Sequence, residues 1–161
     1  MGSIVTFEDL ERIVPELRRQ DKKIVTTNGA FDLLHVGHVR ALQATKNLGD
    51  VLIVGVNSDS SVKKYKSDKR PVVGEHERAE LVASLGCVDY VTIFSEPDPR
   101  AFLTVVRPDI HAKSGDYTAE KMIETPVVRE YGGEVRIIPF QPGFSTTALI
   151  ERIKVIYGSD T

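Results

Sequence analysis

The stretch T-N-G-A-F-D-L-L-H-V-G-H, residues 27–38, places two histidines three positions apart, shortly after a β-rich run. The run Ile24 to Thr27 predicts a strand, and Asn28-Gly29 favours a tight turn after it. A helical pattern follows at once, so His35 and His38 stand at the helix start with Gly37 between them. We expect this strand, turn and helix to form a cradle for a phosphate group, because free backbone N–H groups point outward at a helix start.

Strand-like and helix-like segments alternate along the rest of the chain. Short apolar runs predict five strands, at residues 24–27, 51–56, 88–94, 109–112 and 135–138. Helical spacing of apolar residues predicts helices at residues 7–19, 36–48, 75–85, 98–106, 123–131 and 145–157. We therefore expect an α/β fold, with a Rossmann-like parallel five-stranded sheet and helices on both faces. The chain is expected to form one domain, residues 1–161, with residues 1–22 as an N-terminal helical extension.

Composition excludes several classes of partner. The chain has 161 residues and a formal net charge of -2, which argues against a general nucleic-acid or membrane surface. No apolar run approaches the length of a membrane span. We expect a cytoplasmic protein that binds neither nucleic acid nor membrane.

Three unusual segments each follow a predicted strand directly, at residues 28–38, 57–71 and 113–117. In parallel sheets the carboxyl ends of the strands meet at one edge, where ligands bind near the point at which strand order reverses. The three segments are therefore expected to surround one ligand site.

The histidine pair would supply the chemistry of that site. Spaced three apart, His35 and His38 would lie near one another, and Gly37 would let a ligand approach the backbone closely. The imidazoles would donate hydrogen bonds to the α-phosphate oxygens of a nucleotide as these gain charge. The alternative is a pair of ordinary structural or surface histidines.

A basic run follows the second predicted strand. Five cations stand within eight residues: Lys63, Lys64, Lys66, Lys69 and Arg70. Such a run is usually a solvated surface, but beside a phosphate site one lysine could neutralise a leaving pyrophosphate. Lys64 and Lys66 are the candidates, with Lys64 slightly preferred.

Two further strings suit a phosphate site. In G-F-S-T-T, residues 143–147, the hydroxyls open the last helix, where they would cap N–H groups that can also bind phosphate. In K-S-G-D-Y, residues 113–117, Gly115 allows a tight loop, and Asp116 could accept from a ribose hydroxyl or help to hold a metal. A plain helix cap and a plain β-turn are the alternatives.

The string G-A-F-D-L-L-H-V-G-H resembles the H-x-G-H signature of the nucleotidyltransferase superfamily, which has a cytidylyltransferase-like α/β fold. The family's G-x-S-T-T and K-G-G-D-Y/W strings also have counterparts, with Ser114 in place of a glycine. The resemblance implies ATP with Mg²⁺, no dedicated metal-ligating residues, a homodimer, and catalysis by His35, His38 and Lys64. It implies nucleotide contacts from Asn28, Gly29, Ala30, Phe31, Asp32, Gly37, Lys66, Lys113, Gly115, Asp116, Ser145, Thr146 and Thr147. Acceptor contacts are expected from Asn57, Asp59, Arg70 and Arg78, with a structural role for Arg78 as an equal alternative.

Within this superfamily the chain is most similar to the adenylyltransferase domains of bacterial ADP-heptose synthesis. Strings that carry the likeness include G-V-N-S-D-S-S-V, R-P-V-V and E-R-A-E-L, residues 55–62, 70–73 and 77–81. The resemblance implies transfer of AMP from ATP to D-glycero-β-D-manno-heptose 1-phosphate, for lipopolysaccharide core or surface polysaccharide. The sugar kinase that is often fused to such domains is absent from this sequence, so a stand-alone form is expected.

Two alternatives stay open. The first is a glycerol-3-phosphate cytidylyltransferase, whose family shows R-T-E-G-I-S-T-T before the last helix. Here Phe140 stands at the place of that arginine, which weakens this alternative. The second is a nucleotide-binding module without catalysis, which need not keep both imidazoles.

Overall fold

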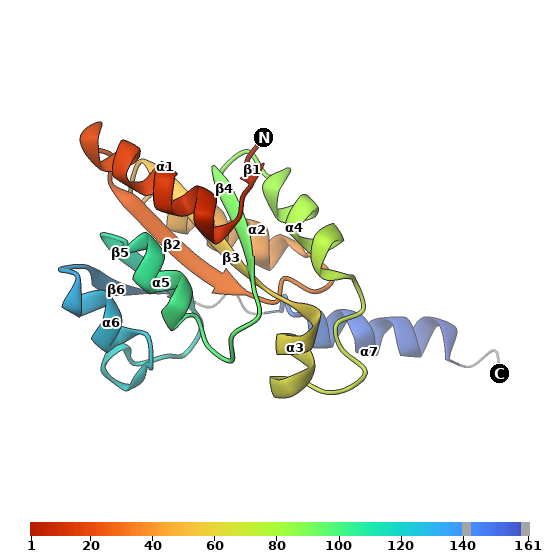
Figure 1. Ribbon diagram of the computed structural model, residues 1–161. Coiled ribbons are helices and arrows are strands. Elements are labelled where there is room, and N and C mark those ends of the chain that lie inside the picture. The colour runs from red at the N-terminus through yellow and green to blue at the C-terminus, as the bar shows by residue number, and fades with distance from the viewer. Residues whose placement is uncertain (140–142, 159–161) are drawn as a thin grey trace.

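Six strands form one parallel sheet in the order β1-β4-β3-β2-β5-β6 (Figure 1). The computed structural model describes residues 1–139 and 143–158 of the chain. Five of the strands lie where the sequence predicted them: β2 (Ile24–Gly29), β3 (Val51–Asn57), β4 (Tyr90–Phe94), β5 (Ile110–Ser114) and β6 (Glu134–Ile138). The predicted α/β fold with a parallel sheet is confirmed.

The predicted number of five strands was wrong by one short edge strand. β1 (Ser3–Ile4) pairs with Tyr90 and Val91 of β4. A two-residue strand is too short to show an alternating pattern, so hydrophobic periodicity does not reveal it. The first 22 residues therefore contribute a strand to the sheet as well as a helix.

Helices cover both faces of the sheet, as predicted. They are α1 (Phe7–Arg19), α2 (Val36–Lys46), α3 (Asp59–Tyr65), α4 (Glu75–Ala83), α5 (Arg100–Val106), α6 (Thr125–Glu130) and α7 (Thr146–Tyr157), with a 3₁₀ turn, η1 (Ala119–Lys121). One apolar core lies between the sheet and α2 and α4, and includes Leu42, Val54 and Val82. A second core lies under α1, α5 and α6, which cover the near face in Figure 1, and includes Leu10 and Phe102.

The first helix is fixed at its start by a reciprocal cap. The Asp9 N–H donates to Thr6 Oγ1 at 3.2 Å, and the Thr6 N–H donates to Asp9 Oδ2 at 3.0 Å. Pro15 lies inside α1 without ending it. The helix buries Leu10, Val14 and Leu17, so it is part of the second core.

The sheet order determines where a ligand can bind. From β2 the chain adds β3 and then β4 on one side, and later adds β5 and β6 on the other. Strand order therefore reverses between β2 and β5, and their carboxyl ends open a crevice there. β3 is buried at all seven positions, as expected of a central strand covered on both faces.

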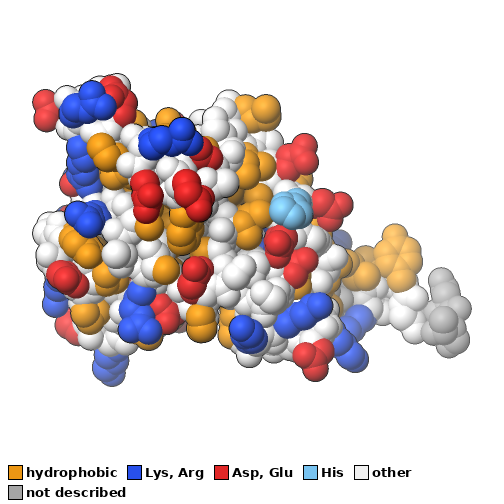
Figure 2. Space-filling model, viewed as in Figure 1, with side chains coloured by type: hydrophobic (Ala, Val, Ile, Leu, Met, Phe, Trp, Pro, Cys, Tyr) orange, Lys and Arg blue, Asp and Glu red, His pale blue; other side chains and the backbone are white. Residues whose placement is uncertain are grey.

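The last helix, α7, differs from the others because it has no buried residue. It leads away from the sheet in Figure 1, and Figure 2 shows apolar side chains near its end. The exposed apolar residues of α7 include Val155 and Tyr157, which are 78% and 69% exposed. Among the described helices, none has the length and apolar character needed to span a membrane.

Candidate active site

A cavity of about 640 Å³ opens at the carboxyl ends of β2, β3 and β5. All three segments that the sequence predicted to surround a ligand site contribute to its lining. The predicted residues that line it are Asn28, Gly29, Ala30, Phe31, Asp32, His35, Gly37, His38, Asn57, Lys66, Arg70, Lys113, Ser145, Thr146 and Thr147. Five predicted residues lie outside the lining: Asp59, Lys64, Arg78, Gly115 and Asp116.

The turn that carries the histidines begins later than predicted. Strand β2 continues through Asn28 and Gly29, which pair with Gly55 and Val56 of β3. The turn follows at residues 30–35, where Phe31 and Leu33 adopt left-handed backbone angles of φ 50° and 49°. Side chains other than glycine rarely adopt such angles, and they do so most often at functional sites.

The two histidine rings lie stacked at the start of α2. Their centroids are 3.8 Å apart with planes inclined by 24°. The backbone N–H of His35 donates to Nδ1 of His38 at 3.4 Å. In the neutral ring the proton of His38 therefore lies on Nε2.

Burial keeps both imidazoles uncharged at neutral pH. Burial and the neighbouring His35 lower the pKa of His38 to about 4. Burial also lowers the pKa of His35 below its usual value. A neutral ring can donate one hydrogen bond from its protonated nitrogen, which suits charge stabilisation without proton transfer.

Gly37 is required by packing inside the protein. A Cβ at this position would lie 2.9 Å from Cε1 and Nδ1 of His35, and 2.9 Å from Cβ of Phe144. Any larger residue would push the His35 ring or the segment before α7 out of place. The structure thus adds a second reason for this glycine beside the predicted approach of a ligand to the backbone.

Asp32 and Arg70 line the cavity but are engaged with each other. The Asp32 carboxylate accepts from Nε of Arg70 and from the N–H groups of Val72 and Val73, both at 3.0 Å. Burial alone would raise the pKa of Asp32, but these N–H groups and the guanidinium together hold it below its usual value. Through these hydrogen bonds the Asp32 carboxylate joins the basic loop to the histidine turn. Few of its acceptor positions therefore remain for a nucleotide.

Arg78 supports the histidine turn from a position outside the cavity lining. Its side chain is fully buried. Nε donates to the Val73 carbonyl at 2.8 Å, Nη1 donates to the Ala30 carbonyl, and Nη2 donates to Asp59 Oδ1 at 2.7 Å. The sequence predicted acceptor contacts from Arg78 and Asp59, but both lie outside the cavity lining and bind each other.

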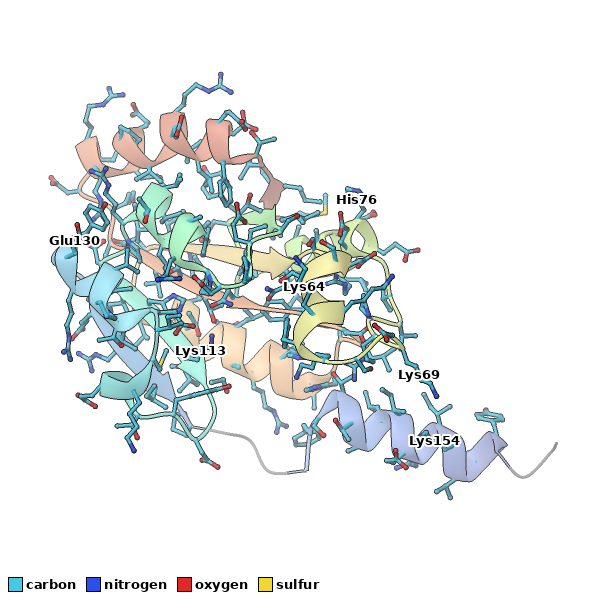
Figure 3. The ribbon with its side chains drawn as sticks, turned by 60° about the horizontal axis from the view of Figure 1, so that its bottom comes forward. Lys64, Lys69, His76, Lys113, Glu130 and Lys154 are labelled. Carbon is cyan, nitrogen blue, oxygen red and sulfur yellow. The ribbon has the colours of Figure 1, made fainter. Side chains whose placement is uncertain are left out.

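The basic run delivers a different lysine to the cavity from the one preferred on sequence grounds. Lys64 extends from α3 (Figure 3) and does not line the cavity, whereas Lys66, at the carboxyl end of the same helix, does. Of the described lysines and arginines that line the cavity, Arg70 pairs with Asp32 and Lys113 pairs with Glu124. Lys66 forms no ion pair with any residue that the structure describes, so its charge is available to an anion.

Lys113 is held by a carboxylate that sequence reasoning missed. Nζ of Lys113 lies 2.6 Å from Glu124 Oε1 and 3.5 Å from Asn28 Oδ1. Glu124 is buried at the start of α6 and lines the cavity. The sequence offered little sign of this pair, because the two residues are brought together by the β5–α6 connection.

The segment before α7 meets the histidine turn directly. Ser145 caps the helix by accepting from the Ala148 N–H at 3.0 Å, and Thr146 Oγ1 donates to the Asp32 carbonyl at 2.6 Å. The starts of α2 and α7 therefore both border the cavity, and two helix N-termini favour an anion between them. Phe140, the residue at the family's arginine position, lies outside the described residues.

The K-S-G-D-Y loop contributes less than predicted. Gly115 has φ 137°, and a Cβ there would lie 2.8 Å from the Tyr117 ring, so this glycine serves the turn itself. Asp116 is exposed and does not line the cavity. Tyr117 lines the cavity instead, together with further residues that sequence reasoning missed: Tyr65, Pro97, Asp98, Pro99 and Ile123.

In the part of the chain that the structure describes, no three His, Cys, Asp or Glu side chains cluster closely enough to hold a metal ion. Mg²⁺ commonly binds through substrate phosphates with few protein ligands. A magnesium ion that binds together with a phosphate ligand would therefore not require such a cluster.

Comparison with protein families gives a match over most of the chain. The cytidylyltransferase-like family model matches residues 26–152. The Bifunctional protein HldE of Geobacter metallireducens is 46% identical over 99% of this chain and 32% of that protein. The Helicobacter pylori protein of the same name is 50% identical over 90% of this chain and 30% of that protein. The chain thus spans about a third of the length of these relatives.

Solved structures agree with the fold. The lipopolysaccharide core biosynthesis protein from Thermoplasma volcanium is 31% identical, with a TM-score of 0.61, over 74% of this chain and 97% of that one. Pantothenate synthetase from Thermus thermophilus has a TM-score of 0.60 at 15% identity, over 86% of this chain and 62% of that one. The second likeness concerns the fold alone.

Proposed function

This chain belongs to the cytidylyltransferase-like family, and from that premise we propose that it transfers the adenylyl group of ATP to D-glycero-β-D-manno-heptose 1-phosphate. The products are ADP-heptose and pyrophosphate, for lipopolysaccharide core or another surface polysaccharide. The relative named for lipopolysaccharide core biosynthesis supports this acceptor class. The observation that carries the proposal is one cavity that joins two stacked neutral histidines, two helix starts and Lys66, which forms no ion pair with a described residue.

The mechanism follows from these groups. An oxygen of the sugar 1-phosphate attacks the α-phosphorus of ATP in line. The new P–O bond forms as the bond to the β-phosphate breaks, and pyrophosphate leaves with the electron pair. Nε2–H of His38 donates to an α-phosphate oxygen as its charge grows.

Lys66 offsets the charge of the pyrophosphate, and the N–H groups at the start of α7 hold the triphosphate. No covalent enzyme intermediate is needed, because the acceptor phosphate is already a competent nucleophile. Catalysis then depends on positioning and on charge stabilisation.

Pyrophosphate release with ATP, CTP, GTP and UTP, each paired with heptose 1-phosphate or glycerol 3-phosphate in the presence of Mg²⁺, tests the proposal. We expect ATP with heptose 1-phosphate to be the active pair. Activity only with CTP and glycerol 3-phosphate would establish the cytidylyltransferase alternative. A nucleotide-induced thermal shift without pyrophosphate release from any pair would indicate a binding module.

Lys66→Met should lower kcat/KM by about 10- to 100-fold, on the scale of one lost hydrogen bond to a charged group. Lys64→Met is the matched control, because it removes the same charge from the same helix outside the cavity. We expect the kcat/KM of this control to stay within about twofold of the wild-type value, as is usual when a solvated surface charge is removed. Pyrophosphate release at varied ATP measures both, and a larger loss in Lys64→Met would reverse the assignment.

We also propose that the protein forms a homodimer and that it is located in the cytoplasm, where ATP is made. The homodimer is supported by the unburied apolar residues of α7, which would gain from cover by a second copy. The mass in solution, measured by light scattering, checks it, and a purely monomeric mass would contradict it.

A further inference from the structure

The loop between β4 and α5 places Pro97, Asp98 and Pro99 in the cavity lining. None of these residues has a role in the mechanism above. Their place in the fold indicates a role in the choice of the acceptor. This inference rests on the proposed function and deepens it.

The sheet order divides the cavity into two walls beside the histidines. One wall follows β5 and contains Lys113, Tyr117, Ile123 and Glu124. The other follows β3 and β4 and contains Asn57, Tyr65, Pro97, Asp98 and Pro99. A two-substrate transfer needs two such walls, because the nucleoside and the acceptor's sugar both extend away from the same α-phosphorus.

The β5 wall suits a flat nucleobase. Tyr117 and Ile123 are each 51% exposed, so they present apolar surface to the cavity. The charges of Lys113 and Glu124 cancel within their ion pair. Apolar surface with a few fixed polar groups is the usual lining for such a ligand.

The β3–β4 wall differs from the β5 wall because it contains side chains with planar polar groups, those of Asn57 and Asp98. Both carboxylate oxygens of Asp98 accept hydrogen bonds from the Arg100 guanidinium. Nε donates to Oδ1 at 2.8 Å and Nη2 donates to Oδ2 at 2.9 Å. The Arg100 N–H also donates to Oδ1 at 3.0 Å. The guanidinium lowers the pKa of this carboxyl, so it stays ionised and acts only as an acceptor.

A chain of hydrogen bonds ties this loop to the end of β3. Nδ2 of Asn57 donates to Ser61 Oγ at 3.1 Å, and Ser61 Oγ donates to the Glu96 carbonyl at 3.2 Å. Asn57 and the Asp98 loop are therefore fixed relative to one another before any ligand binds. A pre-ordered set of acceptors is what selective recognition of hydroxyl groups requires.

We propose that Asp98 accepts hydrogen bonds from hydroxyl groups of the acceptor and thereby determines which sugar or polyol phosphate is used. Arg100 occupies three of the four acceptor positions of this carboxylate, and the one that remains, on Oδ2, is open to a hydroxyl group in the cavity. A site built to bind a hydroxyl group discriminates strongly against ligands that lack it, because its own polar group is then left without a partner.

Asp98→Asn tests this residue while keeping its shape and one carbonyl oxygen for the Arg100 N–H. We expect the acceptor KM to rise at least about tenfold, the scale of a lost hydrogen bond to a charged group, with the ATP KM within about twofold. Unchanged thermal unfolding would show that the effect is not structural. Glu96→Gln is the matched control, since it removes an exposed carboxylate from the same loop outside the lining.

Acceptor binding should also be measured by calorimetry with α,β-methylene-ATP present, because this readout does not depend on turnover. Weaker binding in Asp98→Asn but not in Glu96→Gln supports the inference, even if the wild type releases no pyrophosphate. Equal acceptor affinity in wild type and Asp98→Asn overturns it, even if the wild type is active. Equal loss in both variants would mean a general charge effect and would also overturn it.

Discussion

Replacing His38 with alanine should lower kcat by about 10²-fold or more, on the scale of one lost transition-state donor. The KM for ATP should change much less, because the donor acts mainly on charge that develops during the reaction. Stacking on His35 and the hydrogen bond from the His35 N–H hold the His38 ring in place, so its loss removes a positioned group.

Steady-state pyrophosphate release measures this effect. His76→Ala is the matched control, because His76 lies on α4 away from the cavity and its side chain is 89% exposed. We expect the control to behave as wild type. Near-normal turnover in His38→Ala would show that the assigned role is wrong.

The same histidine predicts the acid side of the pH profile. Because the pKa of His38 is about 4, well below the ordinary 6.5, the ring stays neutral as pH falls through 6.5. Closer to pH 4 the ring gains a proton, and Nδ1 can no longer accept from the His35 N–H. The ratio of wild-type kcat to that of His38→Ala, which cancels the titration of the acceptor phosphate, should therefore decline only well below pH 6.5. A decline of this ratio centred on 6.5 would contradict the burial of this ring.

The fold could be predicted from the sequence because the strands that matter are long enough to show a pattern. β3 is a continuous apolar run that becomes buried on both faces. β1 has only two residues, and its place in the sheet depends on pairing with β4 across 86 positions or more, which no local pattern encodes. Strand ends also predicted the site, since the segments that follow β2, β3 and β5 all reach the cavity.

Two parts of the site were not predicted from the sequence, for different reasons. Whether Lys64 or Lys66 reaches the cavity depends on the direction of the chain at the end of α3. Composition does not reveal that direction. The loop that carries Asp98 follows β4, so the same strand-end argument applied to residues 95–99 would have found it. Its two prolines and two acidic residues are typical of an ordinary connection, so the composition of the loop does not indicate a site.

The sequence left two roles open for Arg78, acceptor binding or structural support, and its helical spacing favours the second. It stands four positions before Val82, on the face of α4 that packs against the sheet. A charge on a buried face needs partners, and the structure provides three oxygens: those of Val73, Ala30 and Asp59. Arg78 thus links the histidine turn, the basic loop and α3.

Arg78→Met should lower the free energy of unfolding by about 2–6 kcal/mol, at about 1–3 kcal/mol for each of two buried carbonyls left without a donor. Asp59 is 39% exposed and water can take over its hydration, so much of this cost comes from the carbonyls of Ala30 and Val73. Arg78→Lys keeps the charge but cannot reach three oxygens in different directions, so an intermediate loss is expected.

Urea unfolding measures these losses, and Arg12→Met is the matched control. Arg12 pairs with Asp9 on the surface and is 77% exposed, so its replacement should cost no more than about 1 kcal/mol. A loss in Arg78→Met no larger than in Arg12→Met would mean that Arg78 does not support the turn. Activity gives a second check, since the Ala30 carbonyl belongs to the turn that positions the histidines. Arg78→Met should therefore lower kcat even under conditions where the variant is fully folded, and Arg12→Met should not.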